Sequence, residues 1–134
     1  MTTQTKELPY RSLIPDDPLH PLIDVEIIGY ANLPFILDSG ASQTLVPKDI
    51  GDFLKVDYSR HADGYAECAH GEKIHFWEAE AKVKIVGEVF TLPVCCTKLQ
   101  KQQPLLGRIG FFDKYLITFD EAEGKIFLQK KPNT

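Results

Sequence analysis

A single carboxylate stands where an apolar run passes into small polar residues. Residues 35–37 are apolar and suited to a buried strand, and Asp38, Ser39 and Gly40 follow directly. A charge at the end of a buried strand needs a reason, because an unpaired buried carboxylate is costly unless its pKa shifts until it is neutral. Two interpretations are open: an ordinary turn between two strands, or a carboxylate placed for proton transfer.

The elements predicted around Asp38 are mostly short strands. Residues 22–28 form a β-branched run that stops at the turn 29–32, and 33–37 resume it, which predicts a β-hairpin leading into Asp38. The further predicted elements are a strand at 44–46, a helical turn at 47–54 with Pro47 first, a hairpin of 83–86 with 89–94, a strand at 105–106, a helical segment at 108–114 and a terminal hairpin of 115–119 with 125–128.

One predicted strand, 73–86, changes its apolar face along its length. Ile74 and Phe76 are apolar at even positions, whereas from Trp77 onward the apolar residues fall at odd positions. A strand with one buried face needs a strict period of two, so the change predicts either a bulge or a strand that leaves the body and meets a different surface. A projecting hairpin with its tip at 69–72 fits this pattern.

Two local details follow from glycine and apolar spacing. The loop of the second hairpin begins at Gly87, and glycine at that position predicts a two-residue type II′ turn. In the segment 108–114, Ile109 and Phe112 fall on one side of a helix, with Phe111 as a further candidate for that apolar side.

The chain also contains an internal repeat. The runs 25–29 and 83–87 each end in glycine and are each followed by a Leu-Pro pair. Each hairpin then leads to a short apolar strand, a glycine and a helical turn with Ile-Gly, at 50–51 and at 109–110. Repetition of this order predicts internal symmetry in the fold.

Composition places the chain among ordinary globular domains. Its 134 residues suit one domain, and 43% hydrophobic with 25% charged residues is typical of a soluble protein. The net charge of -4 argues against nucleic acid or an anionic membrane as partner. No apolar run approaches the length of about 20 residues that spans a bilayer. The first residues lack the order of a signal peptide, so we expect a cytoplasmic protein.

The N-terminal region is polar and interrupted by prolines. We expect residues 1–21 to form an extended arm whose first part is disordered, and regular structure to start at Leu22, so that 22–134 make up the domain.

The cysteines predict a reducing compartment. Their number is odd, and Cys95 and Cys96 are adjacent, whereas Cys68 stands alone. No pair has the two-residue spacing typical of zinc sites, so we expect no metal site. Cys95 and Cys96 are predicted to be buried, inert thiols.

Four features in order carry a resemblance to a known family. They are the Ile-Leu-Asp-Ser-Gly-Ala run at 36–41, the glycine-tipped hairpin near 62–77, the Leu-Leu-Gly-Arg segment at 105–108 and the terminal strand at 117–120. Over roughly 22–129, the chain resembles the retropepsin-type aspartic proteases, the single-lobe relatives of pepsin.

The resemblance implies an all-β fold. It would be a closed, barrel-like acid-protease lobe with a flap hairpin, one or two short helices and an internal pseudo-two-fold repeat. One such lobe carries one catalytic aspartate, and the chain has one Asp-Ser-Gly; we equate its repeat position with 105–107. A catalytic protein must then form a homodimer with its two-fold axis through Asp38. The implied activity is hydrolysis of polypeptides by an aspartic endopeptidase, without cofactor or metal.

The resemblance also assigns roles to the residues of the motif. Asp38 and its copy in the partner would share one proton and activate a water. The hydroxyl of Ser39 would cross to the partner's backbone, and Gly40 would let backbone amides approach the carboxylate. Ala41 and Ser42 are small, as a crowded axis requires, and Ser42 could donate to Asp38.

The remaining site residues lie in the flap and in the second segment. The flap would close over a peptide bound as an added strand, with Tyr65, Ala69, His70 and Gly71 in contact with it. The structural partner segment is Leu105, Leu106, Gly107 and Arg108. For Arg108, pairing with a carboxylate near the dimer interface and simple exposure are both open.

Two alternatives to a homodimeric protease remain. The polar flap residues Glu67, His70 and Glu72 favour a non-catalytic dimer that uses the fold to bind peptides or to act as a scaffold. A subunit that pairs with a different lobe is a further possibility. No motif of a serine or cysteine hydrolase is present.

Overall fold

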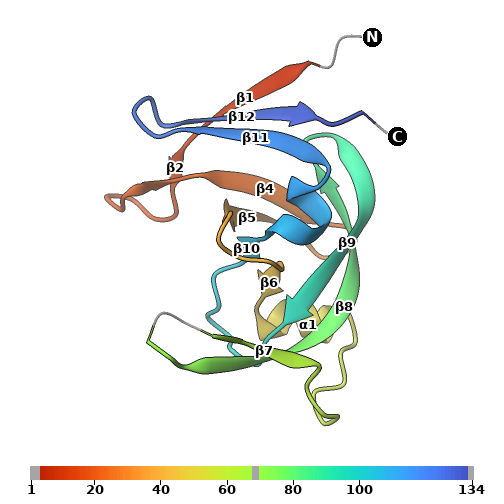
Figure 1. Ribbon diagram of the computed structural model, residues 1–134. Helices are drawn as coiled ribbons and strands as arrows, with labels where there is room; N and C mark the ends of the chain where they lie inside the picture. The colour runs from red at the N-terminus through yellow and green to blue at the C-terminus, as the bar shows by residue number, and fades with distance from the viewer. Residues whose placement is uncertain (1–3, 68–69, 133–134) are drawn as a thin grey trace.

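The computed structural model describes residues 4–67 and 70–132 (Figure 1). Two short helical segments, α1 (Lys48–Phe53) and η1 (Arg108–Phe112), accompany the strands. The strands of the described residues are β1 (Thr5–Pro9), β2 (Arg11–Ser12), β3 (Leu19–His20), β4 (Leu22–Ile27), β5 (Ala31–Leu37), β6 (Leu45–Val46), β7 (Gly64–Glu67), β8 (Lys73–Ile85), β9 (Glu88–Cys96), β10 (Leu105–Leu106), β11 (Tyr115–Asp120) and β12 (Lys125–Lys130). No helix in this described part is long and apolar enough to cross a membrane.

The main sheet closes on itself and is symmetric in its strand order. Its seven strands run β4-β5-β10-β6-β9-β8-β7, and β4 also pairs with β8, which joins the two halves a second time. β5 pairs with β10 in parallel, β9 pairs with β6 in parallel, and β10 meets β6 at the centre. This order confirms the predicted all-β barrel-like lobe and its internal pseudo-two-fold repeat.

The symmetry corrects one equivalence drawn from the sequence. β5 ends before Asp38 and β9 ends before Thr97, and both residues donate a backbone hydrogen bond to the opposite central strand: Asp38 to Leu106, Thr97 to Val46. The repeat counterpart of Asp38 is therefore Thr97, not the segment 105–107. The segment 105–107 instead corresponds to β6 and the residue after it, because both short strands occupy the centre of the sheet.

The core lies inside this closed sheet. β4 alternates between buried and exposed residues after its first two positions, as expected for a strand with one apolar face. Phe35, Val83, Leu106 and Phe111 come from both halves and are almost completely buried. Full burial of such side chains contributes about 1.5–3 kcal/mol each, so the halves stabilise each other.

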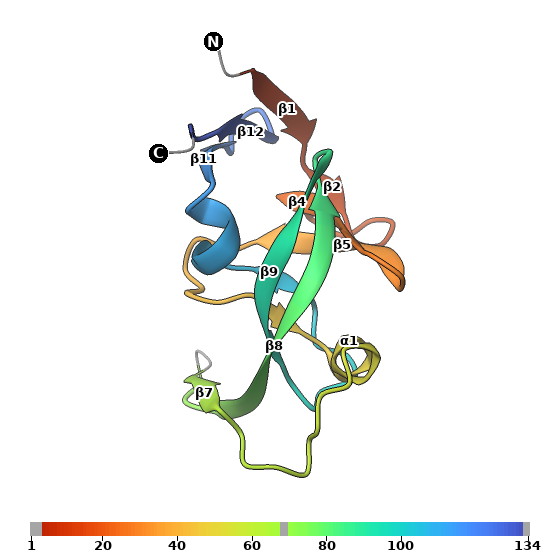
Figure 2. The ribbon, with the colours of Figure 1, turned by 90° about the vertical axis from the view of Figure 1, so that its right-hand side faces the viewer.

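The change of face along β8 has a simple explanation. β8 pairs with β7 through Lys73 to Phe76 and with β9 from Trp77 to Ile85, in one unbroken register. No bulge is present in this strand. From Trp77 to Ile85 the odd-numbered side chains of β8 pack in the core of the body. Residues 73–76, N-terminal to Trp77, lie outside the body, and there the opposite face, which carries Ile74, is the more buried one. Figure 2 shows β8 running out of the body toward β7.

The N-terminal region differs from the expectation of an arm without regular structure. Regular structure begins at Thr5, not at Leu22, because β1 pairs along its whole length with β12 in a three-stranded sheet of order β1-β12-β11. Tyr10 is buried in the core, and its backbone N–H donates to the carbonyl oxygen of Gly124 at 2.7 Å. The predicted terminal hairpin is confirmed as β11 and β12. This sheet lies at the opposite end of the molecule from β7 (Figures 1 and 2).

Two local predictions were wrong. The hairpin loop between β8 and β9 consists of Val86 and Gly87, both at positive φ (43° and 83°), which is a type I′ arrangement and not type II′. In η1, Ile109 is exposed and Phe111 is completely buried. The positive φ of Gly110 (96°) interrupts the helical spacing, so the apolar side that we predicted does not form.

Candidate active site

Asp38 is the first residue of a short turn that backbone hydrogen bonds fix at both ends. The Asp38 N–H donates to the carbonyl oxygen of Leu106 at 3.0 Å, which extends the pairing of β5 with β10. The Asp38 Oδ1 accepts the N–H of Gly40 at 2.9 Å, and the Asp38 carbonyl oxygen accepts the N–H of Ala41 at 3.1 Å. The carboxyl group is therefore fixed in orientation while its side chain stays partly exposed.

The predicted partner segment locks the other end of this turn. The Arg108 N–H donates to the carbonyl oxygen of Ala41, and the Ile109 N–H donates to that of Ser42, both at 3.0 Å. A Cβ at Gly107 would stand 2.3 Å from the carbonyl oxygen of Gln43, so only glycine fits there. The segments around Asp38 and Gly107 are thus one structural unit.

Sequence reasoning missed Thr44, whose hydroxyl joins the two halves of this unit. Thr44 is completely buried, and its Oγ1 accepts the N–H of Gly107 at 3.0 Å. Its carbonyl oxygen accepts the N–H of Cys95 at 2.7 Å. A threonine beside an apolar pair is ordinary strand composition, so the sequence carried no signal for a contact with a residue 63 positions away.

A groove of about 560 Å³ runs past Asp38 and beneath the projecting hairpin. Its apolar lining comes from both the body and the hairpin: Ala41, Leu45, Ala66, Ile74, Phe76 and Leu105. Asp38 and Glu67 are the charged residues along the described lining, which includes no lysine or arginine. The groove could hold an extended apolar chain beside a carboxylate.

The hairpin of β7 and β8 occupies the predicted place of the flap. Tyr65 lines the groove but is half-exposed, and its ring lies 6.4 Å from that of His75. Gly71 has a positive φ of 81° in the connecting loop, and His70 is exposed without lining the groove. Ala69, a predicted contact residue, lies outside the described residues.

Several predicted side-chain roles find no contact within the described chain. Ser39 and Ser42 are exposed, and neither hydroxyl hydrogen-bonds to Asp38 in the part that the structure describes. Ser42 therefore does not support Asp38 as predicted. Arg108 is exposed and makes no ion pair with a described residue of its own chain, and its pairing with a carboxylate near a dimer interface stays a prediction.

The two described thiols lie next to the site but are shielded from it. Cys95 and Cys96 are free and buried. Burial raises the pKa of each thiol to about 12, so neither is a nucleophile near neutral pH. The Cys95 thiol contacts the side-chain oxygen of Gln43. The prediction of buried, inert thiols is confirmed for this pair.

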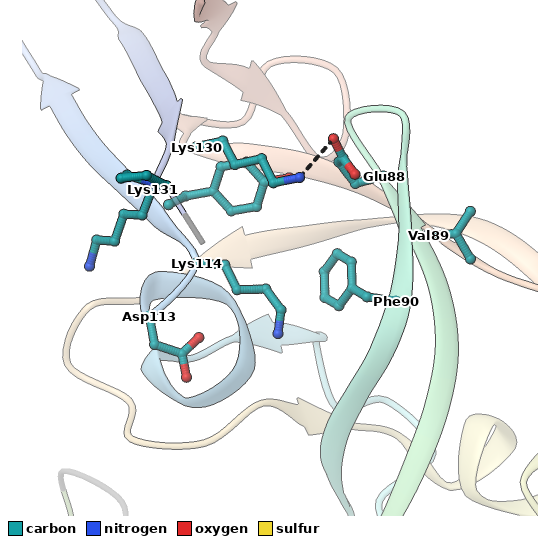
Figure 3. A pocket seen from close by; sticks show the side chains of 9 residues that line it. Glu88, Val89, Phe90, Asp113, Lys114, Lys130 and Lys131 are labelled. Carbon is teal, nitrogen blue, oxygen red and sulfur yellow. Dashed lines mark ion pairs between the residues drawn. The ribbon is translucent and has the colours of Figure 1, made fainter. Parts of the chain in front are cut away.

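A pocket far from Asp38 offers a different chemistry (Figure 3). It lies between the start of β9, the residues after η1 and the end of β12, and its side chains include Lys114, Lys130 and Phe90. The carboxylate of Glu88 is paired with Lys130 at 3.2 Å, and Lys114 lies over the Phe90 ring at 4.9 Å. Asp113 also lines the pocket, and its carboxylate accepts the N–H of Gly110 at 3.1 Å. Three lysines line this pocket, whereas the described lining of the groove at Asp38 has none.

Solved structures with the same architecture are known. A retropepsin-like aspartic protease from Rickettsia conorii matches with a TM-score of 0.67 at 17% identity, over 96% of this chain and 94% of that one. EIAV protease complexed with the inhibitor HBY-793 gives 0.55 at 18% identity, over 70% and 86%. The retroviral protease-like domain of Ddi1 from Leishmania major gives 0.56 at 10% identity, over 84% and 94%. No protein-family model and no curated protein matches the sequence.

These similarities define the fold. The chain has the retropepsin-like fold of aspartic proteases, as the four sequence features predicted. At identities of 10–18%, the likeness establishes architecture, and the chemistry has to be argued from the residues of this chain.

Proposed function

We propose that this protein is an aspartic endopeptidase whose catalytic pair forms between Asp38 of two copies in a homodimer. The observation that supports it best is the placement of Asp38: its backbone is held by Leu106, its carboxyl group is oriented by Gly40, and it faces a groove beneath a hairpin. An ordinary turn aspartate does not require a mostly apolar groove of this size.

One chain supplies half of such a site. The repeat counterpart of Asp38 is Thr97, which is completely buried and carries no carboxyl group. A second carboxylate must therefore come from another chain, and in a homodimer a two-fold axis beside Asp38 would bring two copies of it together. The buried free thiols agree with the proposed cytoplasmic location.

The proposed mechanism uses two carboxyl groups that share one proton. The ionised group removes a proton from a water, and the neutral group donates its proton to the carbonyl oxygen of the peptide as the water oxygen attacks the carbon. Collapse of the resulting diol breaks the C–N bond: the leaving nitrogen takes a proton from the neutral carboxyl group, and the ionised one takes a proton from a diol hydroxyl, which restores the pair with one proton. The two titrations belong to the pair and not to either residue.

The hairpin and the groove would supply binding. An extended substrate can lie in the groove with apolar side chains against Ile74, Phe76 and Leu105. The hairpin would cover it and exclude water from the carboxyl groups. Tyr65 and Glu67 are exposed and line this groove as well, so the hairpin brings polar as well as apolar groups to it.

Substitution of Asp38 by asparagine tests the proposal. Asp38→Asn should lower peptide cleavage by about a hundred- to ten-thousandfold, because it removes the group that carries the proton. Asp49→Asn, an exposed aspartate on α1, should leave cleavage unchanged. Activity per chain should rise with concentration as dimers form, and sedimentation should detect the dimer. Full cleavage by Asp38→Asn would rule the mechanism out.

The polar residues of the hairpin favour one alternative, a non-catalytic dimer, which the same measurements of cleavage and dimerisation test. A dimer that binds a pepstatin-like inhibitor and yet cleaves no peptide from acidic to neutral pH would be a peptide-binding module with the same fold. A chain that remains monomeric at all concentrations would instead require a different partner lobe.

A further inference from the structure

The flap hairpin has a second pocket on the face opposite the groove at Asp38. This outer pocket measures about 590 Å³ and is formed by the loop before β7, the root of β8 and the residues after β9. Lys73 and His75 line it, whereas Phe76, on the other face of the same strand, lines the groove; Ile74 borders both. One strand thus separates the two spaces.

The two faces of the hairpin differ in charge. Three basic side chains line the outer pocket, Arg60, Lys73 and Lys98, together with two histidines and one carboxylate, that of Glu72. The groove at Asp38 has two carboxylates and no lysine or arginine in its described lining. This local excess of positive charge occurs in a chain whose net charge is -4.

Aromatic rings hold two of these cations in place. The Lys98 ammonium lies over the Trp77 ring at 5.2 Å, and that of Lys73 lies over the Tyr65 ring at 4.5 Å. Neither lysine forms an ion pair with a described residue. The third cation is already engaged, because Arg60 binds both carboxylate oxygens of Asp63 at 2.9 Å. Two positioned ammonium groups are therefore available to a ligand.

The floor of the pocket is apolar and rigid. Trp77 and Tyr58 pack edge to face with ring centres 4.9 Å apart, and the Trp77 indole N–H donates to the Arg60 carbonyl oxygen at 3.0 Å. Leu99 borders the pocket and is 48% exposed, so its side chain is accessible to a ligand. A ligand with one apolar group between negative charges matches this arrangement.

We propose that the outer pocket is a docking site for an acidic peptide segment carrying one apolar side chain. Its carboxylates would lie at Lys73 and Lys98, and the apolar side chain would pack on Leu99 and Trp77. Such a segment is repelled by the carboxylates of the groove at Asp38, so the two sites select different peptides. Because Lys73 belongs to the flap strand, occupation of the pocket would hold the hairpin against the body.

Trp77 makes the test direct, because it is the single tryptophan of the chain. A short synthetic peptide in which glutamates flank one leucine is titrated into the full-length Asp38→Asn protein, so that cleavage cannot contribute. Saturable change in tryptophan fluorescence, weakened by salt, is expected. Hydrogen exchange of the amides of β7 and of β8 should slow in the bound state.

Matched variants decide the basis of binding. Lys73→Gln and Lys98→Gln should each weaken the peptide about two- to fivefold, as expected for exposed charge pairs. Lys82→Gln, on the same strand but outside the pocket, should not change the affinity. A control peptide has glutamine in place of each glutamate, and the proposal is overturned if this peptide binds as tightly as the acidic one. It is also overturned if all three variants bind the acidic peptide with equal affinity, or if no saturable signal appears at low salt. None of these readouts depends on peptidase activity, so the proposal can fail independently of the proposed function.

Discussion

The backbone N–H of Asp38 donates to the carbonyl oxygen of Leu106 at 3.0 Å, and this bond joins two turns that lie 68 positions apart in the sequence. The symmetric hydrogen bond, from the N–H of Thr97 to the carbonyl oxygen of Val46 at 3.1 Å, joins the two corresponding turns of the repeat. Each central strand thus ends where a turn of the other half begins. The carboxylate of Asp38 is oriented by the packing of the whole sheet and not by its own loop alone.

Gly107 is the position where this arrangement tolerates least change. A Cβ there would meet the Gln43 carbonyl oxygen at 2.3 Å and its carbonyl carbon at 2.4 Å, and a backbone cannot turn aside as a side chain can. We expect Gly107→Ala to destabilise the protein by about 3 kcal/mol or more. Chemical denaturation measures this loss.

A glycine in open space provides the control for Gly107. No atom of the residues that the structure describes lies within 4 Å of a Cβ added at Gly71, so Gly71→Ala should cost only the strain of its positive φ of 81°, about 1 kcal/mol. Similar losses for the two variants would contradict the assigned role of Gly107.

The close approach of Tyr58 to Gly51 allows a second test, in which a change at one residue should partly compensate a change at the other. The Tyr58 hydroxyl is buried without a hydrogen-bond partner in the described part of the chain, and a Cβ at Gly51 would overlap it. Gly51→Ala should cost about 1–3 kcal/mol. Tyr58→Phe alone should leave stability unchanged or raise it by about 1 kcal/mol, because it removes an unpaired buried hydroxyl.

The double variant completes this cycle. Phenylalanine at position 58 lacks the hydroxyl that overlaps the new Cβ, although its ring carbon would still approach to 2.8 Å and Cys96 to 3.0 Å. The combined variant should therefore recover part of the loss. Strictly additive effects in the denaturation midpoints would show that the two residues do not interact.

The sequence predicted the fold because its signals are local and repeated. The two hairpins and the phase change at Trp77 follow from residue order alone, and both have counterparts in the structure. The predicted glycine after each short strand is present after β10, as Gly107, but Pro47 follows β6. The phase change could not distinguish a bulge from a departing strand, since both give the same pattern. The registers of β8 with its two neighbours decide that point.

The missed features depend on contacts between distant residues. The pairing of β1 with β12 joins the two ends of the chain, and a short polar segment such as 5–9 has no periodic signal that predicts it. The equivalence of Thr97 with Asp38 shares no residue type, so only the sheet order could identify it. For the same reason, the buried hydroxyl of Thr44 could not be assigned to Gly107 from the sequence.

The raised pKa of Cys95 and Cys96 predicts their labelling behaviour. With a pKa of about 12 each, about one thiol in ten thousand is ionised at pH 8. In a Cys68→Ser background, which leaves these two thiols alone, a thiol reagent should react only as fast as the protein unfolds. In denaturant, two thiols per chain should react. Rapid labelling of the native protein would contradict their burial.

The carboxylate of Asp63 predicts how stability depends on acid. Arg60 donates to both of its oxygens at 2.9 Å and the Glu78 N–H donates to it at 2.7 Å, and these bonds lower the pKa of Asp63 to about 2 from an ordinary 3.8. A pKa lowered on folding contributes stability above the unfolded value, and that stability is lost as the pH falls from about 4 toward about 2.

Replacement of Asp63 should therefore flatten this part of the pH profile. In Asp63→Asn, denaturation midpoints should be lower than in the original protein near neutral pH, and the difference should shrink as the pH approaches about 2. Asp49→Asn, which alters an exposed aspartate on α1, should follow the original profile throughout. If the original protein and Asp63→Asn lost stability in parallel over this range, the hydrogen bonds to Asp63 would contribute nothing in solution. A difference that shrinks with acid would instead show that they hold the loop at the root of the flap.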